Sequence, residues 1–107
     1  MKNNIENQIN INEKWYFMIV QNPSTAKEEF MAFQEENTKL KFLPIFKTKE
    51  EAKQCFKLMP KELFSDEYEV QAVIEDDLLS IANEYDYQLY LLDGNGKIYN
   101  KLMSEQK

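Results

Sequence analysis

The chain has 107 residues, of which 43% are hydrophobic and 13% aromatic, and its formal net charge is -6. This length fits one domain with a packed core, and no apolar run is long enough to span a membrane. The single cysteine excludes an internal disulfide, and the sequence contains no histidine and no arginine. Imidazole-based catalysis and bidentate guanidinium clamps are therefore excluded. The negative charge is the opposite of what a nucleic-acid binder needs.

The first residues are rich in asparagine and carry little apolar surface. We expect residues 1–12 to form a disordered tail, because so few apolar side chains cannot offset the entropy lost on ordering, and residues 13–103 to form one globular domain. The alternative is an accessory strand built on Ile9 and Ile11. The N-terminus has no apolar signal-peptide region, so we expect a cytoplasmic protein that binds neither membranes nor nucleic acid.

Two segments rich in branched and aromatic residues predict the first strands. The segment WYFMIVQ (15–21) is apolar on both faces, which is typical of a central strand that is covered on both sides. The segment KFLPIF (41–46) contains Pro44, which cannot donate a hydrogen bond to a neighbouring strand. We therefore expect this second strand at an edge of the sheet or at a bulge.

Three helices are predicted by their N-terminal signals and by the spacing of their apolar residues. Capping boxes, in which a hydroxyl and a carboxylate satisfy free backbone amides, are predicted at Thr25–Glu28 and Thr48–Glu51. The first opens a helix that runs to about Glu36, and the second opens a helix that Pro60 stops. Asp76 is expected to cap a short third helix. The three apolar helix faces are Ala26, Phe30 and Phe33; Ala52, Cys55, Phe56 and Met59; and Leu78, Ile81 and Ala82.

The C-terminal half contains three further strand signals. Alternation in YEVQAVI (68–74) predicts a strand with one apolar face, and YQLYLL (87–92) and KIY (97–99) predict a closing hairpin. The element order is β-α-β-α-β-α-β-β. The predicted fold class is therefore α+β, with a single mixed sheet of four or five strands and short helices mainly on one face.

The segment DGNGKI (93–98) contains both glycines and looks like the middle of a calcium-binding EF-hand loop. Such a loop needs an acidic residue at its first and its last position, which here are Leu91 and Leu102, and it needs a helix on each side. A tight hairpin turn with a positive φ at glycine or asparagine fits every residue. We therefore expect a turn and no metal site.

The acidic groups and the cysteine suggest structural rather than catalytic roles. Acidic residues cluster at Glu28–Glu29, Glu35–Glu36, Glu50–Glu51 and Glu75–Asp77, and three of these groups lie at predicted helix N-termini, where the helix dipole favours negative charge. We interpret them as solvated capping acids rather than as a catalytic pair or a carboxylate metal site. Cys55 lies on an apolar helix face with no histidine to activate it, so we interpret it as a core thiol rather than a nucleophile. No catalytic, cofactor-binding or metal-binding residue is predicted.

Aromatic residues are the main candidates for a functional surface. Tyrosine and tryptophan are enriched in interface hot spots, and an exposed aromatic face of a sheet is a natural docking surface. The alternative is that these side chains are core or half-buried sheet residues. The candidate protein-binding residues are Tyr90, Tyr99, Tyr87, Tyr85, Trp15 and Tyr16.

The segment Leu43–Ala52 is a strand that ends in Pro-x-Phe and is followed by a threonine-capped helix. It resembles the N-terminal domain of the SseB family and related small bacterial and cyanobacterial domains of unknown function. In that family a helix, a strand, a short leucine-rich helix and a closing strand follow, and the order of Tyr68–Ile74, Leu78–Ala82 and Gln88–Leu92 is similar. The resemblance implies a non-catalytic domain and assigns no site residues.

These observations predict a small acidic protein–protein interaction module without enzymatic activity, such as a regulator, an adaptor or an immunity-type inhibitor. Its carboxylates would steer a basic partner toward an aromatic surface, and a homodimer is compatible with the sequence. The alternative is a small-molecule-binding domain with a pocket between the helices and the sheet. No cofactor is expected.

Overall fold

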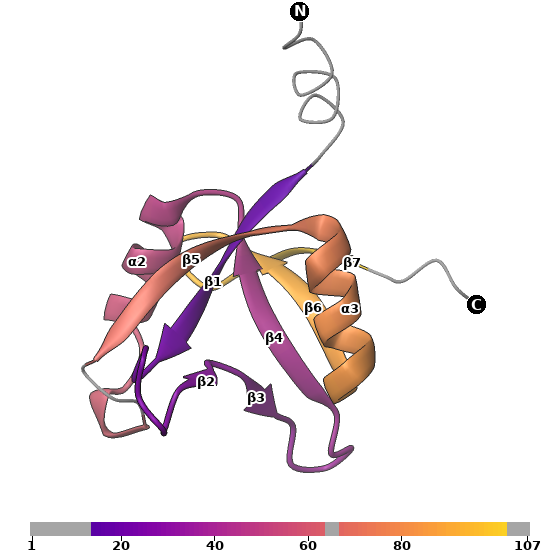
Figure 1. Cartoon of the computed structure of the whole chain (residues 1–107), viewed down its shortest axis with the longest axis horizontal. Coiled ribbons are helices and arrows are strands. Elements are labelled where there is room, and N and C mark those ends of the chain that lie inside the picture. The colour runs from indigo at the N-terminus through magenta and orange to yellow at the C-terminus, as the bar shows by residue number, and fades with distance from the viewer. Residues whose placement is uncertain (1–13, 64–66, 103–107) are drawn as a thin grey trace, which may run out of the picture.

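The computed structural model describes residues 14–63 and 67–102 (Figure 1), so the predicted tail over residues 1–12 lies outside the described residues. The described chain forms a mixed sheet and two α-helices, which confirms the α+β class. Neither helix has the length or the apolar character of a membrane span within these residues. The elements are β1 (Trp15–Gln21), β2 (Glu29–Phe30), β3 (Phe33–Gln34), β4 (Lys41–Phe46), α2 (Lys49–Lys57), the 3-10 turn η1 (Lys61–Leu63), β5 (Tyr68–Ile74), α3 (Glu75–Tyr85), β6 (Tyr87–Leu92) and β7 (Ile98–Leu102).

Five main strands lie in the order β5-β1-β4-β6-β7. Strand β5 is antiparallel to β1 along its full length, β4 is parallel to β6, and β7 is antiparallel to β6. The apolar strand β1 is central, as its two apolar faces predict, because it pairs with β5 on one side and with β2 and β4 on the other. The sheet is mixed because the connection through α2, β5 and α3 places β4 and β6 parallel, whereas the closing hairpin places β6 and β7 antiparallel.

Strands β1 and β4 meet only near one end and then diverge (Figure 1). They share the pair Phe17 and Phe46, and the wedge that opens beyond it is filled by the two short strands, β2 against β1 and β3 against β4. Met31, between the short strands, donates its N–H to the carbonyl of Ile19 at 2.8 Å. This hydrogen bond satisfies a backbone carbonyl of β1 at a position where β1 has no pairing with β4.

The predicted helix over residues 25–36 is wrong, because this segment is a turn followed by extended chain. Asn22 has a φ of 51°, and the hydroxyl of Thr25 donates to the carbonyl of Asn22 at 2.7 Å. The threonine therefore closes a turn instead of capping a helix. Phe30 and Met31 then pack into different cores, an arrangement that alternation along an extended chain provides.

Of the two predicted alternatives for the strand of Pro44, the edge position is wrong, because β4 lies between β1 and β6, and the pairing of β4 with β6 shows no bulge. Its pairing explains why proline is tolerated there. On the side away from β6, the described pairings of β4 are those of Phe46 with β1 and of Lys41 and Phe42 with β3. Pro44 falls between them, in the wedge, where a strand partner for its missing N–H is not required.

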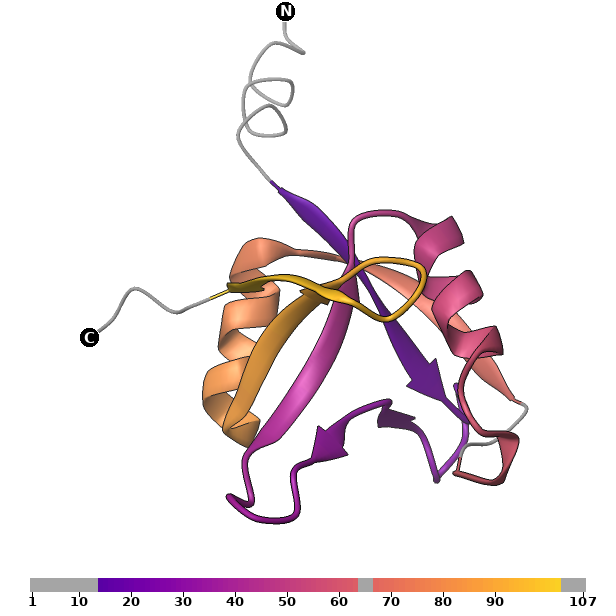
Figure 2. The same cartoon turned by 180° about the vertical axis from the view of Figure 1, so that it is seen from behind.

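The two helices cover opposite faces of the sheet and not mainly one face as predicted (Figures 1 and 2). Helix α3 lies in front of the sheet in Figure 1 and behind it in Figure 2, whereas α2 is on the other side. Successive residues of β1, β4 and β6 point to alternate faces and so supply both cores. The α3-side core contains Met18, Val20, Leu43, Ile45, Val73, Leu78, Leu89 and Leu91. The α2-side core contains Ile19, Met31, Phe46, Ala52, Cys55, Phe56 and Leu92.

The two helices begin in different ways. Helix α2 begins as predicted, because the Thr48 hydroxyl accepts a hydrogen bond from the N–H of Glu51 at 3.1 Å. Helix α3 begins at Glu75, and its N-cap residue makes no side-chain hydrogen bond. The N–H of Glu75 instead donates to the carbonyl of Lys14 at 2.9 Å. The predicted capping role of Asp76 is therefore wrong: a backbone carbonyl just before β1 takes over that role.

The segment DGNGKI forms a hairpin turn between two strands, as predicted. The carboxylate of Asp93 accepts hydrogen bonds from the N–H groups of Asn95 at 2.8 Å and Lys97 at 2.9 Å. Gly96 has a φ of 85°, a conformation that favours glycine. The acidic side chain that opens the segment thus holds the turn together.

Cys55 is buried, as predicted, with 2% of its surface exposed. The turn lies against the same helix: the Gln54 amide donates to the Asn95 side chain at 3.3 Å, and a Cβ on Gly94 would lie 2.8 Å from Gln54 Oε1. Burial raises the pKa of the Cys55 thiol, and the Asp93 carboxylate raises it further. Both effects disfavour the reactive thiolate.

Candidate functional site

Three aromatic rings cluster on the α3 side of the sheet. The ring centroids of Phe30 and Tyr85 are 5.9 Å apart, those of Phe30 and Tyr87 are 6.4 Å apart, and those of Tyr85 and Tyr87 are 6.0 Å apart. Phe30 meets both tyrosines edge to face, which is a favourable geometry for aromatic pairs. Tyr85 remains 46% exposed. We call Phe30, Tyr85 and Tyr87 the aromatic cluster.

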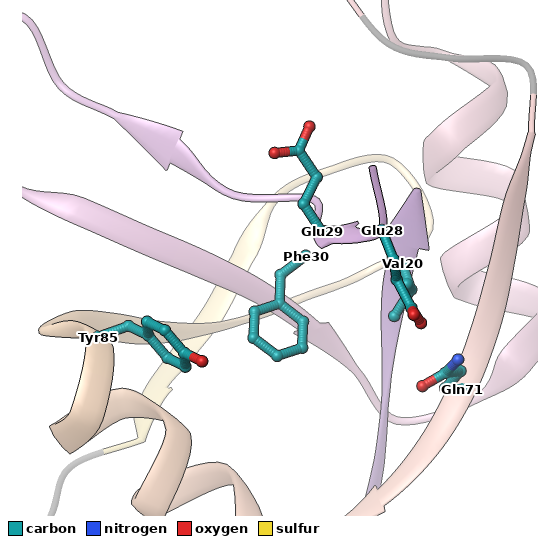
Figure 3. Close-up of a pocket in the computed structure, with 6 residues that line it drawn as sticks. All are labelled: Val20, Glu28, Glu29, Phe30, Gln71 and Tyr85. Carbon is teal, nitrogen blue, oxygen red and sulfur yellow. The ribbon is translucent and has the colours of Figure 1, made fainter. Parts of the chain in front are cut away.

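A pocket of about 370 Å³ lies beside the aromatic cluster. Figure 3 shows the rings of Phe30 and Tyr85 on one side, the Glu28 carboxylate pointing toward the side of Gln71, and the Glu29 carboxylate turned the opposite way. The pocket therefore has aromatic side chains, Phe30 and Tyr85, on one side and polar side chains, Glu28 and Gln71, on the other. It is lined by Val20, Glu28, Glu29, Phe30, Gln71 and Tyr85.

The wedge in the sheet explains this arrangement. Because β2 is extended and pairs with the end of β1, its side chains alternate in direction. Phe30 packs on the α3 side with Val20, and Glu28 shares that direction while Glu29 turns away. The residue that ends α3, Tyr85, closes the pocket from the side of the helix.

Several acidic groups surround the pocket, and one lysine, Lys41, lies near it with its ammonium group 5.5 Å from the Tyr87 ring. The Gln71 amide donates to the Glu69 carboxylate at 3.1 Å, and Glu69 pairs with Val20 across the sheet. The last turn of α3 carries no basic residue, and its C-cap residue is Asp86. A helix C-terminus bears a partial negative charge, which no cation of that turn offsets. Burial raises the pKa of Tyr87, and Glu29 and Tyr85 raise it further.

Tyr90 lies on the opposite face of β6 from Tyr87. It packs against the α2-side core, and its ring centroid is 5.1 Å from that of Phe42. Phe42 in turn stacks on Phe33 at 5.2 Å. The ammonium group of Lys101 lies 6.0 Å from the Tyr90 ring. This second aromatic row is half-buried and separate from the aromatic cluster.

The remaining predicted aromatics lie apart from both groups. Trp15 begins β1 and is 52% exposed, and Tyr99 on β7 is 55% exposed. Tyr16 is half-buried against the α3-side core, where burial and the Glu75 carboxylate raise its pKa. The ammonium group of Lys47 lies 5.2 Å from the Tyr99 ring. Of the six predicted residues, the structure brings together only Tyr85 and Tyr87.

Three pocket residues, Glu28, Glu29 and Phe30, are missed by the sequence prediction because it places them in a helix. The helix predicted over residues 25–36 contains all three, and the alternation in residues 68–74 predicts Gln71 on the polar face of a strand. One residue favours an extended chain over a helix. Met31 is apolar but does not fit the helix face of Phe30, whereas alternation along a strand places the two residues on opposite sides.

Most of the other acidic groups lie in a turn or at the start of a helix. Thr38 donates its N–H to the Glu35 carboxylate at 2.9 Å, and its hydroxyl and N–H lower the pKa of Glu35. Glu50–Glu51 and Glu75–Asp77 lie in the first turns of α2 and α3, as predicted, whereas Glu28–Glu29 precede no helix. Over residues 14–63 and 67–102, no three acidic or cysteine side chains are grouped to hold a metal ion.

No protein-family model, curated protein or solved structure matches this chain. The resemblance to the SseB N-terminal domain therefore stays a prediction.

Proposed function

We propose that this protein is a small acidic interaction module that binds a basic protein partner and performs no catalysis. The observation that carries this proposal is the pocket in which the rings of Phe30 and Tyr85 face the Glu28 side of the sheet. Aromatic anchors at the centre of an interface, surrounded by polar groups, are the usual source of protein-binding energy. The net charge of -6 would attract a basic partner from a distance.

The packing around the pocket supports a docking role. Tyr85 is held by two aromatic neighbours, although nearly half of its surface is exposed. A side chain that is already fixed loses little conformational entropy when a partner covers it. Glu28, Glu69 and Asp86 are exposed around it, where charges act mainly on the rate of encounter.

A small-molecule-binding domain is the second candidate function, favoured by a pocket between α3, β6 and β7. This pocket has a volume of about 270 Å³ and combines the apolar Leu79, Leu89 and Leu102 with the polar Asn83 and Gln88. Ligand pockets commonly occupy about 300–1,000 Å³, so this one is small for such a role. The protein-binding function is therefore preferred.

The test begins with capture of partners from native lysate and continues with binding kinetics. We expect association with the recovered partner to slow as salt is raised, because screening weakens the long-range attraction. Tyr85→Ala should speed dissociation by about tenfold or more, as for a hot-spot aromatic.

Tyr99→Ala is the matched control, because Tyr99 is similarly exposed but lies outside the pocket. Circular dichroism must first show that both variants are folded. Unchanged dissociation in folded Tyr85→Ala would remove the pocket as a docking site. Faster dissociation in Tyr99→Ala alone would move the docking surface to β7.

A further inference from the structure

Building on the proposed function, we infer that the pocket receives one cationic side chain of the partner, a lysine or an arginine. Its alkyl stem passes along Phe30 and Tyr85, and its charged head stays within reach of both ring faces and points toward Glu28.

The two rings in the pocket differ in one respect from three other tyrosine rings of the described residues. Lysine ammonium groups of the chain itself lie over Tyr87 at 5.5 Å, Tyr99 at 5.2 Å and Tyr90 at 6.0 Å. Among the described residues no lysine lies over Phe30 or Tyr85. An ammonium or guanidinium group within about 6 Å of a ring centroid is attracted by the negative face of the ring. The pocket thus presents two rings that a cation from outside can reach.

The charge around the pocket fits the same ligand. Its lining contains Glu28 and Glu29 and no basic residue. Helix α3 ends beside it with its carbonyl dipoles and Asp86, and no basic side chain of its last turn compensates them. An exposed ion pair alone contributes little to affinity. The carboxylate therefore orients the charged head, the ring faces attract it, and the rings and Val20 contact the stem.

The shape of the site favours a side chain over a free metabolite. Glu28 is exposed and Tyr85 is nearly half exposed, so the pocket is open on the side from which a partner would approach. Small-molecule sites usually enclose most of the ligand surface. A side chain delivered by a docked protein does not need such enclosure, because the rest of the interface holds it in place.

Nuclear magnetic resonance titration with short capped peptides tests this inference without the natural partner. The probes are glycine-lysine-glycine, glycine-arginine-glycine and glycine-norleucine-glycine, of which the last has an alkyl side chain without charge. We expect the lysine or the arginine peptide to shift the amide signals of Glu28, Phe30, Gln71 and Tyr85 with saturation in the millimolar range. The norleucine peptide should bind about tenfold more weakly or not at all.

Two variants and one further probe complete the test. Glu28→Gln should weaken binding of the cationic peptide several-fold, whereas Glu36→Gln, an exposed glutamate outside the pocket, should leave it unchanged. Equal binding of the norleucine peptide, or an unchanged affinity in folded Glu28→Gln, would overturn the inference. Binding of free spermidine about a hundredfold tighter than the peptides would assign the site to a small amine instead.

The outcomes separate this inference from the proposed function. If the cationic peptides do not bind but Tyr85→Ala still speeds dissociation of the partner, the module binds its partner through Tyr85 without a cationic side chain. If neither effect is found, both proposals fail.

Discussion

Met31→Ala tests the wedge between β1 and β4, because Met31 is the buried residue that joins the two short strands. Its side chain is 1% exposed and belongs to the α2-side core. Fully burying a methionine side chain contributes about 1.5–3 kcal/mol, most of which alanine forfeits. A residual cavity of about 40 Å³ adds about 1 kcal/mol at about 24 cal/mol per Å³. We therefore expect the free energy of unfolding to fall by about 3 kcal/mol.

Urea unfolding followed by circular dichroism measures this loss. For a domain of this size the same loss lowers the melting temperature by more than about 10 °C. Leu40→Ala is the control, since Leu40 lies in the same connection but is 50% exposed, and its effect should be no more than about 1 kcal/mol. If Met31→Ala also stays within about 1 kcal/mol of the wild type, Met31 is not held in the wedge and the extended path of residues 29–34 is refuted.

Four further predictions concern the region around the DGNGKI turn. Cys55→Ser should lower the free energy of unfolding by roughly 1–3 kcal/mol, because it buries a hydroxyl without a sure partner; rapid alkylation of the native thiol together with unchanged stability would place Cys55 at the surface. Because the pKa of Cys55 is raised in the folded protein above its ordinary value of 9.0, the wild type loses stability as the pH rises above that value, and its advantage over Cys55→Ser should shrink there. Gly96→Ala should cost about 1–2 kcal/mol through its positive φ, whereas Gly94→Ala needs only a shift of the flexible Gln54 amide and should cost less; urea unfolding that shows the reverse order would contradict this account of the turn. Millimolar calcium should produce no saturable heat and no change in melting temperature, because the Asp93 carboxylate already accepts two backbone hydrogen bonds; a micromolar site would raise stability by several kcal/mol.

The elements that could be predicted from sequence are those whose signals are local. Strand β1, helix α2 and the turn at Gly96 follow from apolar runs, the capping spacing at Thr48 and glycine chemistry, and the structure confirms each. The same capping spacing at Thr25 failed. The choice between a helix and a strand there depends on the free edge of β1, and that edge exists only because β4 diverges from it. No local pattern carries that information.

The candidate site was harder to predict for the same reason. Tyr85 and Tyr87 were chosen as aromatic residues, and the structure brings them together. Their partner Phe30 comes from a distant part of the chain, and it faces them only because β2 is extended. Composition alone groups Tyr90 with them, although the alternation of side chains along β6 places it on the other face. Composition identified the residue types, and only the pairing of the strands fixed the neighbours.

The two cores on opposite faces have a consequence for how the central strand finds its alignment. In a sheet with one apolar face, a shift by one residue exposes the apolar side chains and is rejected. A shift of β1 by one residue would replace Ile19 on the α2 side by Met18 or Val20. Both faces of the strand would therefore remain apolar. Backbone hydrogen bonds alone do not select the alignment, because backbone groups are the same at every residue, so the fit of individual side chains in the two cores must do so. We expect shifted β1 pairings to act as kinetic traps, so that the search for the correct alignment, rather than chain collapse, limits the folding rate.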